Sequence, residues 1–197
     1  DEKVRFVLIY GVKEEYWGFH EALTLESSTS HTRALDFIKS QLEVLVPELA
    51  DLHYVKAQKA VKKSNRSAVK KEFSLSSHYN RTFVETFPQH EQTAPRFVLL
   101  GESELKLFNW SMAIDAFEQA GYEFENYTAA AEAAYASVLA YKDYAKTWPK
   151  GSKETMETTE TKKLRETLRE KQHRSRLKFV QRHAQDKRAL GVLFIAT

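Results

Sequence analysis

The Lys and Arg residues of this chain are concentrated in two stretches, and this is the strongest chemical signal in its sequence. Residues 56–71 carry seven basic residues and no acidic one, and residues 162–188 carry eleven against Glu166, Glu170 and Asp186. The two stretches together hold a charge of +15, whereas the whole chain of 197 residues holds +3. Like charges held together repel, so this grouping gains nothing for folding. An anionic partner would offset the repulsion, most often a nucleic acid backbone.

The candidate nucleic-acid-binding residues are therefore basic side chains from both stretches. Each phosphate that a protein neutralises releases a counterion, so affinity requires many such side chains on one face. The candidates are Lys56, Lys59, Lys62, Lys63, Arg66, Lys70 and Lys71 in the first stretch, and Arg169, Arg174, Arg176, Lys178 and Arg182 in the second. The alternative is a solvated surface on which acidic patches of the same protein face these side chains.

A second pattern, Glu104-Leu105-Lys106, offers catalytic chemistry. Many metal-dependent nucleases use such a pair, in which Glu binds a divalent ion and Lys positions the attacking water. A further acidic residue upstream is needed, for which Glu85 and Glu91 are the options. The pattern also has a structural explanation, in which Ser103 caps a helix and Glu104 lies in its first turn. We expect a binding protein rather than an enzyme, with the nuclease as an alternative.

Other patterns that bind ligands are missing from the sequence. The seven histidines show no metal-ligand spacing, and neither a glycine-rich phosphate loop nor a hydrolytic triad is visible. No metal or cofactor is therefore expected. An aromatic group at Tyr10, Tyr16, Trp17 and Phe19 could stack on unpaired bases, although a place in the core is the preferred interpretation. No apolar run approaches the roughly 18 residues of a membrane-spanning helix, so no membrane partner is expected.

All four asparagines lie in N-glycosylation sequons, which suggests a different class of function. Under this alternative the protein is secreted, and its basic faces bind a sulfated glycan or a partner protein. Asn80 is then the expected acceptor, because it falls on a predicted turn, and Asn109 the least expected, because it falls inside a predicted helix. The absence of cysteine instead favours a reducing compartment, so we expect an intracellular protein of the cytoplasm, nucleoid or nucleus.

The hydrophobic pattern predicts an α+β fold, with N-terminal antiparallel β-hairpins packed on helices and a mostly helical C-terminal half. Strands are predicted where β-branched and aromatic residues accumulate. These runs are residues 3–12 and 16–26, residues 69–75 and 81–87 around a turn at 76–80, and residues 96–100.

Helices are predicted where apolar residues recur every three or four positions. The stripe from Leu35 to Leu52 forms either one helix or two that meet at Pro47. Further helices are expected over residues 103–121, from about 126 to 148, and over a long charged segment from about 161 to 188. The octet Arg169–Arg176 of that last helix has no apolar residue, so we expect it to bridge solvent or to lie on a ligand.

We expect a core domain over residues 1–149 and an appendage over residues 150–197, made of a linker, the long basic helix and a short apolar tail. The tail, residues 189–196, is expected to form a buried strand or a docking segment for a partner protein. The expected function is a non-enzymatic nucleic-acid-binding module that contacts mainly phosphates and could belong to a larger protein or assembly. No helix-turn-helix, zinc finger or single-strand motif is visible, so DNA and RNA both remain open.

Overall fold

The computed structural model describes residues 29–147 and 158–196, with side chains over residues 35–147 and 158–194, and every regular element in them is an α-helix. The predicted α+β fold is therefore wrong for this part of the chain. Residues 69–75, 76–80 and 81–87 fall almost wholly within one helix, and 96–100 in the next, while the hairpin predicted within residues 3–26 lies outside the described residues. The helices are α3 (Thr29–Lys62), α4 (Arg66–Thr86), α5 (Thr93–Lys106), α6 (Trp110–Tyr122), α7 (Ala130–Lys146), α8 (Thr159–Arg182) and α9 (Ala189–Ala196).

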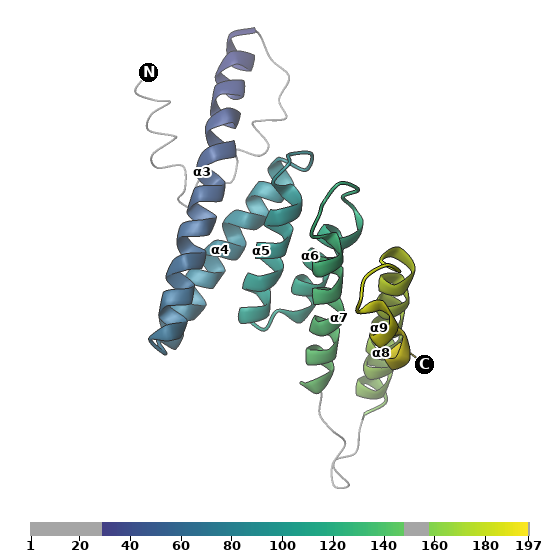
Figure 1. Cartoon of the computed structure of the whole chain (residues 1–197). Coiled ribbons are helices and arrows are strands. Elements are labelled where there is room, and N and C mark those ends of the chain that lie inside the picture. The colour runs from purple at the N-terminus through teal and green to yellow at the C-terminus, as the bar shows by residue number, and fades with distance from the viewer. Residues whose placement is uncertain (1–28, 148–157, 197) are drawn as a thin grey trace.

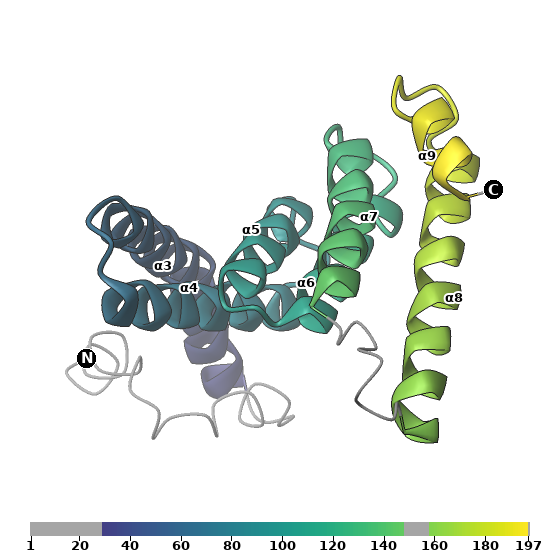
Figure 2. The same ribbon diagram turned by 90° about the horizontal axis from the view of Figure 1, so that it is seen from below.

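Each helix packs on the helix before it and the helix after it, which gives an open stack in chain order (Figures 1 and 2). Alpha-solenoids are built in the same way, from helix pairs that contact only their neighbours. Figure 1 shows that the α3–α4 and α5–α6 turns, the end of α7 and the start of α8 all lie at the lower edge of the stack. We call this the tip edge. The α4–α5 and α6–α7 turns lie at the opposite edge.

The core is a series of small apolar clusters between neighbouring helices. Phe83 and Phe87 pack with Val46 of α3, and Phe117 of α6 packs with Tyr141 of α7 and Leu168 of α8. A third cluster places Phe179 of α8 against Tyr122, Ala134, Val138, Ala189 and Val192. The apolar surface is therefore buried pair by pair along the stack rather than in one central core.

Small polar residues explain why α4 forms across a segment that resembles two strands and a turn. Its buried face consists of Phe73, Ser76, Ser77, Asn80, Phe83 and Val84, which recur at helical spacing. Serine and asparagine favour turns when they are exposed, but here they are packed against α5. The Ser103 hydroxyl of α5 lies 3.3 Å from that of Ser76. Close approach of the two helices overrides the local preference.

Most of the other predicted helices are confirmed. α3 continues through Pro47, so the single-helix alternative is correct, and the predicted long charged helix is confirmed as α8. The helix expected from about residue 126 to 148 is confirmed as α7. The helix predicted over 103–121 is wrong at its start, because Ser103 lies buried within α5 and a turn separates Lys106 from Trp110. The predicted boundary between residues 149 and 150 lies in the segment 148–157, outside the described residues.

The apolar tail forms a short helix, α9, rather than a strand. Ala189 and Val192 are buried against α8, whereas Leu190 and Phe194 are 71% and 81% exposed. Its expected role in docking a partner protein stays a prediction. Among the described helices, none combines the length and the apolar character that crossing a bilayer requires.

Close packing at Gly121 gives a test of the stack. A Cβ atom there would lie 2.6 Å from the backbone nitrogen of Ala134, so Gly121→Ala must force α6 and α7 apart. We expect the free energy of unfolding in a denaturant titration to fall by about 1–3 kcal/mol. Gly191→Ala is the control, because nothing lies within 4 Å of its added Cβ, and a helical Gly→Ala change stabilises by up to about 1 kcal/mol. Equal stability of the two variants would contradict this packing.

Candidate nucleic-acid interface

The first basic stretch forms the tip of the α3–α4 hairpin. All seven of its Lys and Arg side chains are exposed, and none forms an ion pair with another described residue. We call these residues, Lys56, Lys59, Lys62, Lys63, Arg66, Lys70 and Lys71, the basic tip. The tip is compact because the turn is tight. Ser64 adopts a left-handed φ of 54°, the Asn65 N–H donates to the Ala60 carbonyl at 3.0 Å, and the Asn65 side chain then caps α4.

Two halves of the basic tip differ in their effect on the helices. Lys59 and Lys62 lie in the last turn of α3, where the negative end of the helix dipole favours cations. Arg66 is the first residue of α4, whose first turn holds no acidic residue. A cation at that position is unfavourable, because the N-terminal end of a helix is positive. Lys59 and Lys62 thus stabilise the end of α3, whereas the charge of Arg66 does not stabilise α4.

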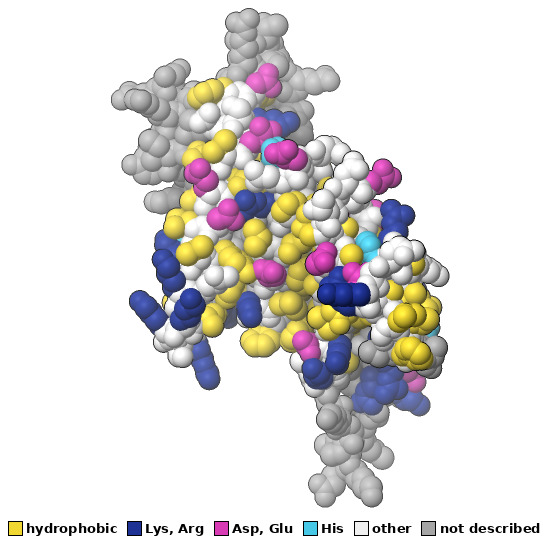
Figure 3. Space-filling view, viewed as in Figure 1, with side chains coloured by type: hydrophobic (Ala, Val, Ile, Leu, Met, Phe, Trp, Pro, Cys, Tyr) yellow, Lys and Arg dark blue, Asp and Glu magenta, His cyan; other side chains and the backbone are white. Residues whose placement is uncertain are grey.

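The two edges of the stack carry different charges between the end of α5 and the end of α7. No Lys or Arg occurs between Lys106, at the end of α5, and Lys142, in the last turns of α7. The loops and helix ends of the opposite edge instead carry exposed acidic residues, namely Glu85, Glu91, Glu123, Glu125 and Glu132. In Figure 3 dark blue side chains gather over the lower ends of the helices, and magenta ones lie mostly above them. Over α3–α7 the tip edge is therefore the more basic of the two edges, while Arg182, Lys187 and Arg188 lie at the other end of α8.

The second basic stretch is divided by the packing of α8. Leu168, Ser175 and Phe179 are its buried residues, and the candidates Arg169, Arg174, Arg176, Lys178 and Arg182 fall on both sides of that line. Arg169, Arg174, Lys178 and Arg182 are exposed, while burial lowers the pKa of Arg176. The Lys178 ammonium lies 4.0 Å from the centre of the Tyr122 ring, a cation–π contact that ties α8 to α6. These five residues therefore do not form one basic face.

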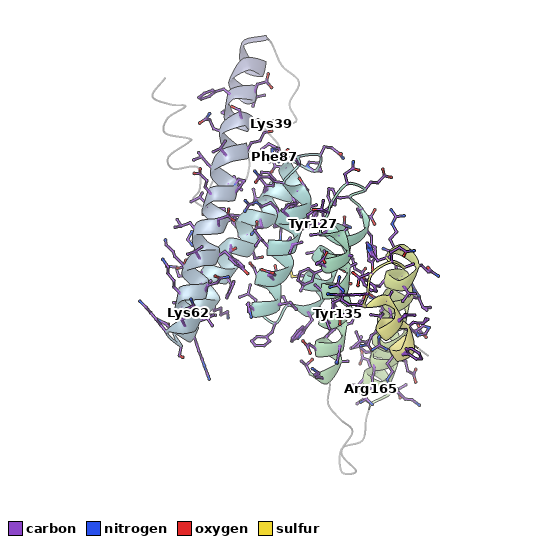
Figure 4. The ribbon with its side chains drawn as sticks, in the orientation of Figure 1. Lys39, Lys62, Phe87, Tyr127, Tyr135 and Arg165 are labelled. Carbon is purple, nitrogen blue, oxygen red and sulfur yellow. The ribbon has the colours of Figure 1, made fainter. Side chains whose placement is uncertain are left out.

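The start of α8 is the part of this stretch that reaches the tip edge. Lys162 and Lys163 are exposed in its first turns, and Figure 4 shows Arg165 at the lower edge, as it shows Lys62 at the end of α3. The cations at the tip edge are thus the candidates of the basic tip at one end and, at the other, residues of the first turns of α8 that were not among the candidates. Lys106, Lys142 and Lys146 lie between them along the stack.

The octet Arg169–Arg176 was expected to have no side that could be buried, and this is wrong. Ser175 is buried, with its hydroxyl 3.1 Å from the Glu118 carboxylate of α6 and 3.4 Å from the Ser137 hydroxyl of α7. Burial raises the pKa of Glu118, and the hydrogen bond from Ser175 partly opposes that shift. Ser175 is small and forms hydrogen bonds, so α8 packs closely on α6 and α7 at this point without an apolar side chain. Arg169 and Arg174 stay exposed, so acidic residues do not enclose the octet.

An aromatic cluster that sequence reasoning missed lies midway along the tip edge. Phe108 is 73% exposed in the α5–α6 turn, and its ring centre lies 6.0 Å from that of Trp110. Trp110 in turn stacks on Tyr144 of α7, with 6.3 Å between ring centres and 14° between planes. The apolar pattern had placed Phe108 inside an amphipathic helix. Asn109 before Trp110 and Ser111 was a usable signal, because Asn is a favoured N-cap and would have started the helix there.

Glu104 is held in place by hydrogen bonds from two sides. Its side chain is 3% exposed; one carboxylate oxygen accepts from Ser77 at 2.6 Å and from Arg81 at 2.8 Å, and the other accepts from Asn109 at 2.6 Å. Lys106 is exposed, and Glu85 and Glu91 lie at the opposite edge. The structure therefore separates the residues of the Glu-x-Lys hypothesis and gives Glu104 a structural role. Among the described residues, no group of three His, Asp or Glu side chains is placed to hold a metal.

The four sequon asparagines occupy different environments. Asn80, the expected acceptor, is fully buried in α4 rather than on a turn between strands. Asn65 and Asn109 sit at the N-caps of α4 and α6, with their side chains bonded to Ala68 and Glu104. Only Asn126, exposed in the α6–α7 turn, presents its side chain without such a bond among the described residues. Helix capping thus accounts for Asn65, and the hydrogen bond to the buried Glu104 accounts for Asn109.

Comparisons of the chain with protein-family models, with curated proteins and with solved structures found no match. Function is therefore inferred from the geometry of the chain itself.

The helix dipole predicts opposite effects for one charge reversal at the two sides of the α3–α4 turn. Arg66→Glu puts an anion at the start of α4, and we expect the free energy of unfolding to rise by about 0.3–1 kcal/mol at low ionic strength. Lys62→Glu makes the same change of net charge at the end of α3, where the dipole opposes it. Thermal unfolding at low and high salt measures both. A Lys62→Glu protein more stable than the Arg66→Glu protein would contradict the assignment.

The structural role of Glu104 predicts a loss of stability when its charge is removed. Glu104→Gln leaves Arg81 without its carboxylate and replaces one acceptor with a donor, so we expect about 1–3 kcal/mol lower stability by denaturant titration. Glu85→Gln, at an exposed position of α4, should change stability by less than about 0.5 kcal/mol. A catalytic metal site would behave differently. Mg²⁺ or Mn²⁺ would then raise the melting temperature of the wild type and not that of Glu104→Gln.

Proposed function

We propose that this protein is a helical-stack module that binds nucleic acid along the tip edge, mainly through contacts to phosphates. The basic tip carries the proposal: seven exposed cations at the end of one helical hairpin, none of them in an ion pair with a described residue. Arg66 strengthens it, because its charge opposes the dipole of its own helix and so has a ligand-binding explanation but no structural one.

The positions of the other cations extend the proposed surface beyond one hairpin. Lys106 and Lys142 follow the basic tip along the edge with Lys146, which pairs with Asp143 at 2.6 Å, and the first turns of α8 complete it. A row of cations on successive helix ends suits a linear polyanion better than a small anion, which would need a single enclosed site. We expect such a module in a compartment that holds nucleic acid, the cytoplasm, nucleoid or nucleus.

Charge reversal at the basic tip tests the proposal. In fluorescence anisotropy at 0.1 M salt with labelled single-stranded and duplex oligonucleotides, Lys63→Glu/Arg66→Glu should weaken binding by roughly tenfold or more. The slope of log affinity against log salt should also fall, by about 0.9 for each duplex phosphate that the variant no longer neutralises. Arg66→Glu alone should also weaken binding, and reduced folding stability would not explain that loss, because this change is expected to stabilise α4.

The matched control is Lys39→Glu/Lys187→Glu, which changes net charge equally at exposed positions away from the tip edge. It should bind within about threefold of the wild type, since distant surface charges are screened beyond roughly 10 Å at 0.1 M salt. Equally weakened binding in the two double variants would show a net-charge effect and overturn the tip-edge site. Binding to heparin without binding to either oligonucleotide would overturn the nucleic-acid proposal in favour of a sulfated glycan.

A further inference from the structure

Phe108 occupies a backbone position that disfavours it. Its φ is 63°, and the Asn109 N–H donates to the Glu104 carbonyl at 2.9 Å, so Phe108 is the left-handed residue that ends α5. Glycine or asparagine is usual at this position, because a Cβ atom there costs roughly 1–2 kcal/mol. The chain's other described left-handed residue is the small, polar Ser64. A phenylalanine in this position is a departure from what local stability favours.

Burial of the Phe108 side chain does not offset the cost of its left-handed backbone conformation. Phe108 is 73% exposed, the second most exposed large hydrophobic side chain among the described residues, and its ring makes an edge contact with Trp110. A strained backbone position that the surrounding structure maintains is typical of functional sites. The exposed side chain of Phe108 therefore suggests a role in binding. The Trp110–Tyr144 stack beneath Phe108 is partly buried and fixes the direction in which the ring projects.

The charges around Phe108 indicate what the ring meets. Lys106 lies two residues before it at the end of α5, and the basic tip and the first turns of α8 flank the α5–α6 turn along the edge. In Figure 3 hydrophobic side chains reach the lower edge between dark blue ones on either side. An exposed aromatic ring within a track of cations is the arrangement by which proteins bind single strands, since the cations follow the backbone and the ring stacks on a base.

We infer that the ligand of the tip edge is single-stranded nucleic acid, and that an unpaired base stacks on Phe108 while the backbone follows the cations on either side. This inference rests on the proposed function and narrows it to one substrate class. A duplex keeps its bases stacked on one another, so its binding would use the cations and leave Phe108 aside.

Substitutions at Phe108 separate stacking from folding. Phe108→Gly should raise the denaturant midpoint, because glycine relieves the left-handed strain, yet weaken binding of a 12-nucleotide single strand by roughly 5- to 100-fold. Phe108→Leu keeps an apolar side chain without a π face and should weaken binding similarly. Phe108→Trp should retain it. Binding of the matched 12-base-pair duplex should change less than about twofold in all three.

Quenching of 2-aminopurine in the single strand gives a direct signal of stacking, which Phe108→Gly should abolish.

The outcomes distinguish this inference from the proposed function. Wild-type protein that binds both oligonucleotides with salt dependence, and whose single-strand affinity Phe108→Gly leaves unchanged, would overturn the stacking role and leave the basic interface standing. Full binding by Phe108→Leu would also overturn it, since a merely apolar contact would then suffice. Wild-type protein that binds neither oligonucleotide would overturn both.

Discussion

The geometry of the tip edge depends on the carboxylate of Glu104. It accepts hydrogen bonds from Ser77 and Arg81 of α4 and from Asn109 at the start of α6, so one buried group connects three helices. Its backbone carbonyl also accepts from the Asn109 N–H and closes the α5–α6 turn. Removing any donor would leave part of a buried charge unpaired, which is expensive in a low-dielectric interior. The turn that presents Phe108 is therefore fixed from the inside, by the residue whose type first suggested metal chemistry.

Small residues are the second requirement of the stack, and they explain which helices the sequence could predict. α3, α7 and α8 were recognisable because apolar or alanine periodicity and charge pairing act within a single helix. α4 and α5 were not, because Ser76, Asn80 and Ser103 resemble turn residues until a neighbouring helix covers them. Tertiary packing overrode the local preferences there, as it did at Ser175 on α8.

The sequence predicted where the positive charge of the candidate site lies, but it did not predict the backbone turn that exposes Phe108. The basic tip could be found from sequence because a run of Lys and Arg without acidic residues is visible whatever the fold. Phe108 could not, since its meaning depends on a left-handed φ and on the end of α5, and the apolar pattern continued smoothly through both. Two of the sequons also have a structural explanation. Asn65 caps α4 and Asn109 donates to Glu104, and a short motif does not distinguish such structural roles from that of a glycosylation acceptor.

Alternating helix directions give the charge of the tip edge its significance. Helices that end there present a negative dipole end, and helices that begin there present a positive one, so an uncharged edge would alternate in sign. Lys62, Lys106 and Lys146 cover negative ends, where stability alone favours them. Arg66, Lys162 and Lys163 add charge to ends that are already positive. The second group adds positive charge where the helix dipole opposes it, beside Glu160 in the first turn of α8 and beside Asp143, which pairs with Lys146 at the end of α7. Cations placed against the dipole do not stabilise their helices, whereas they would help to bind an extended polyanion.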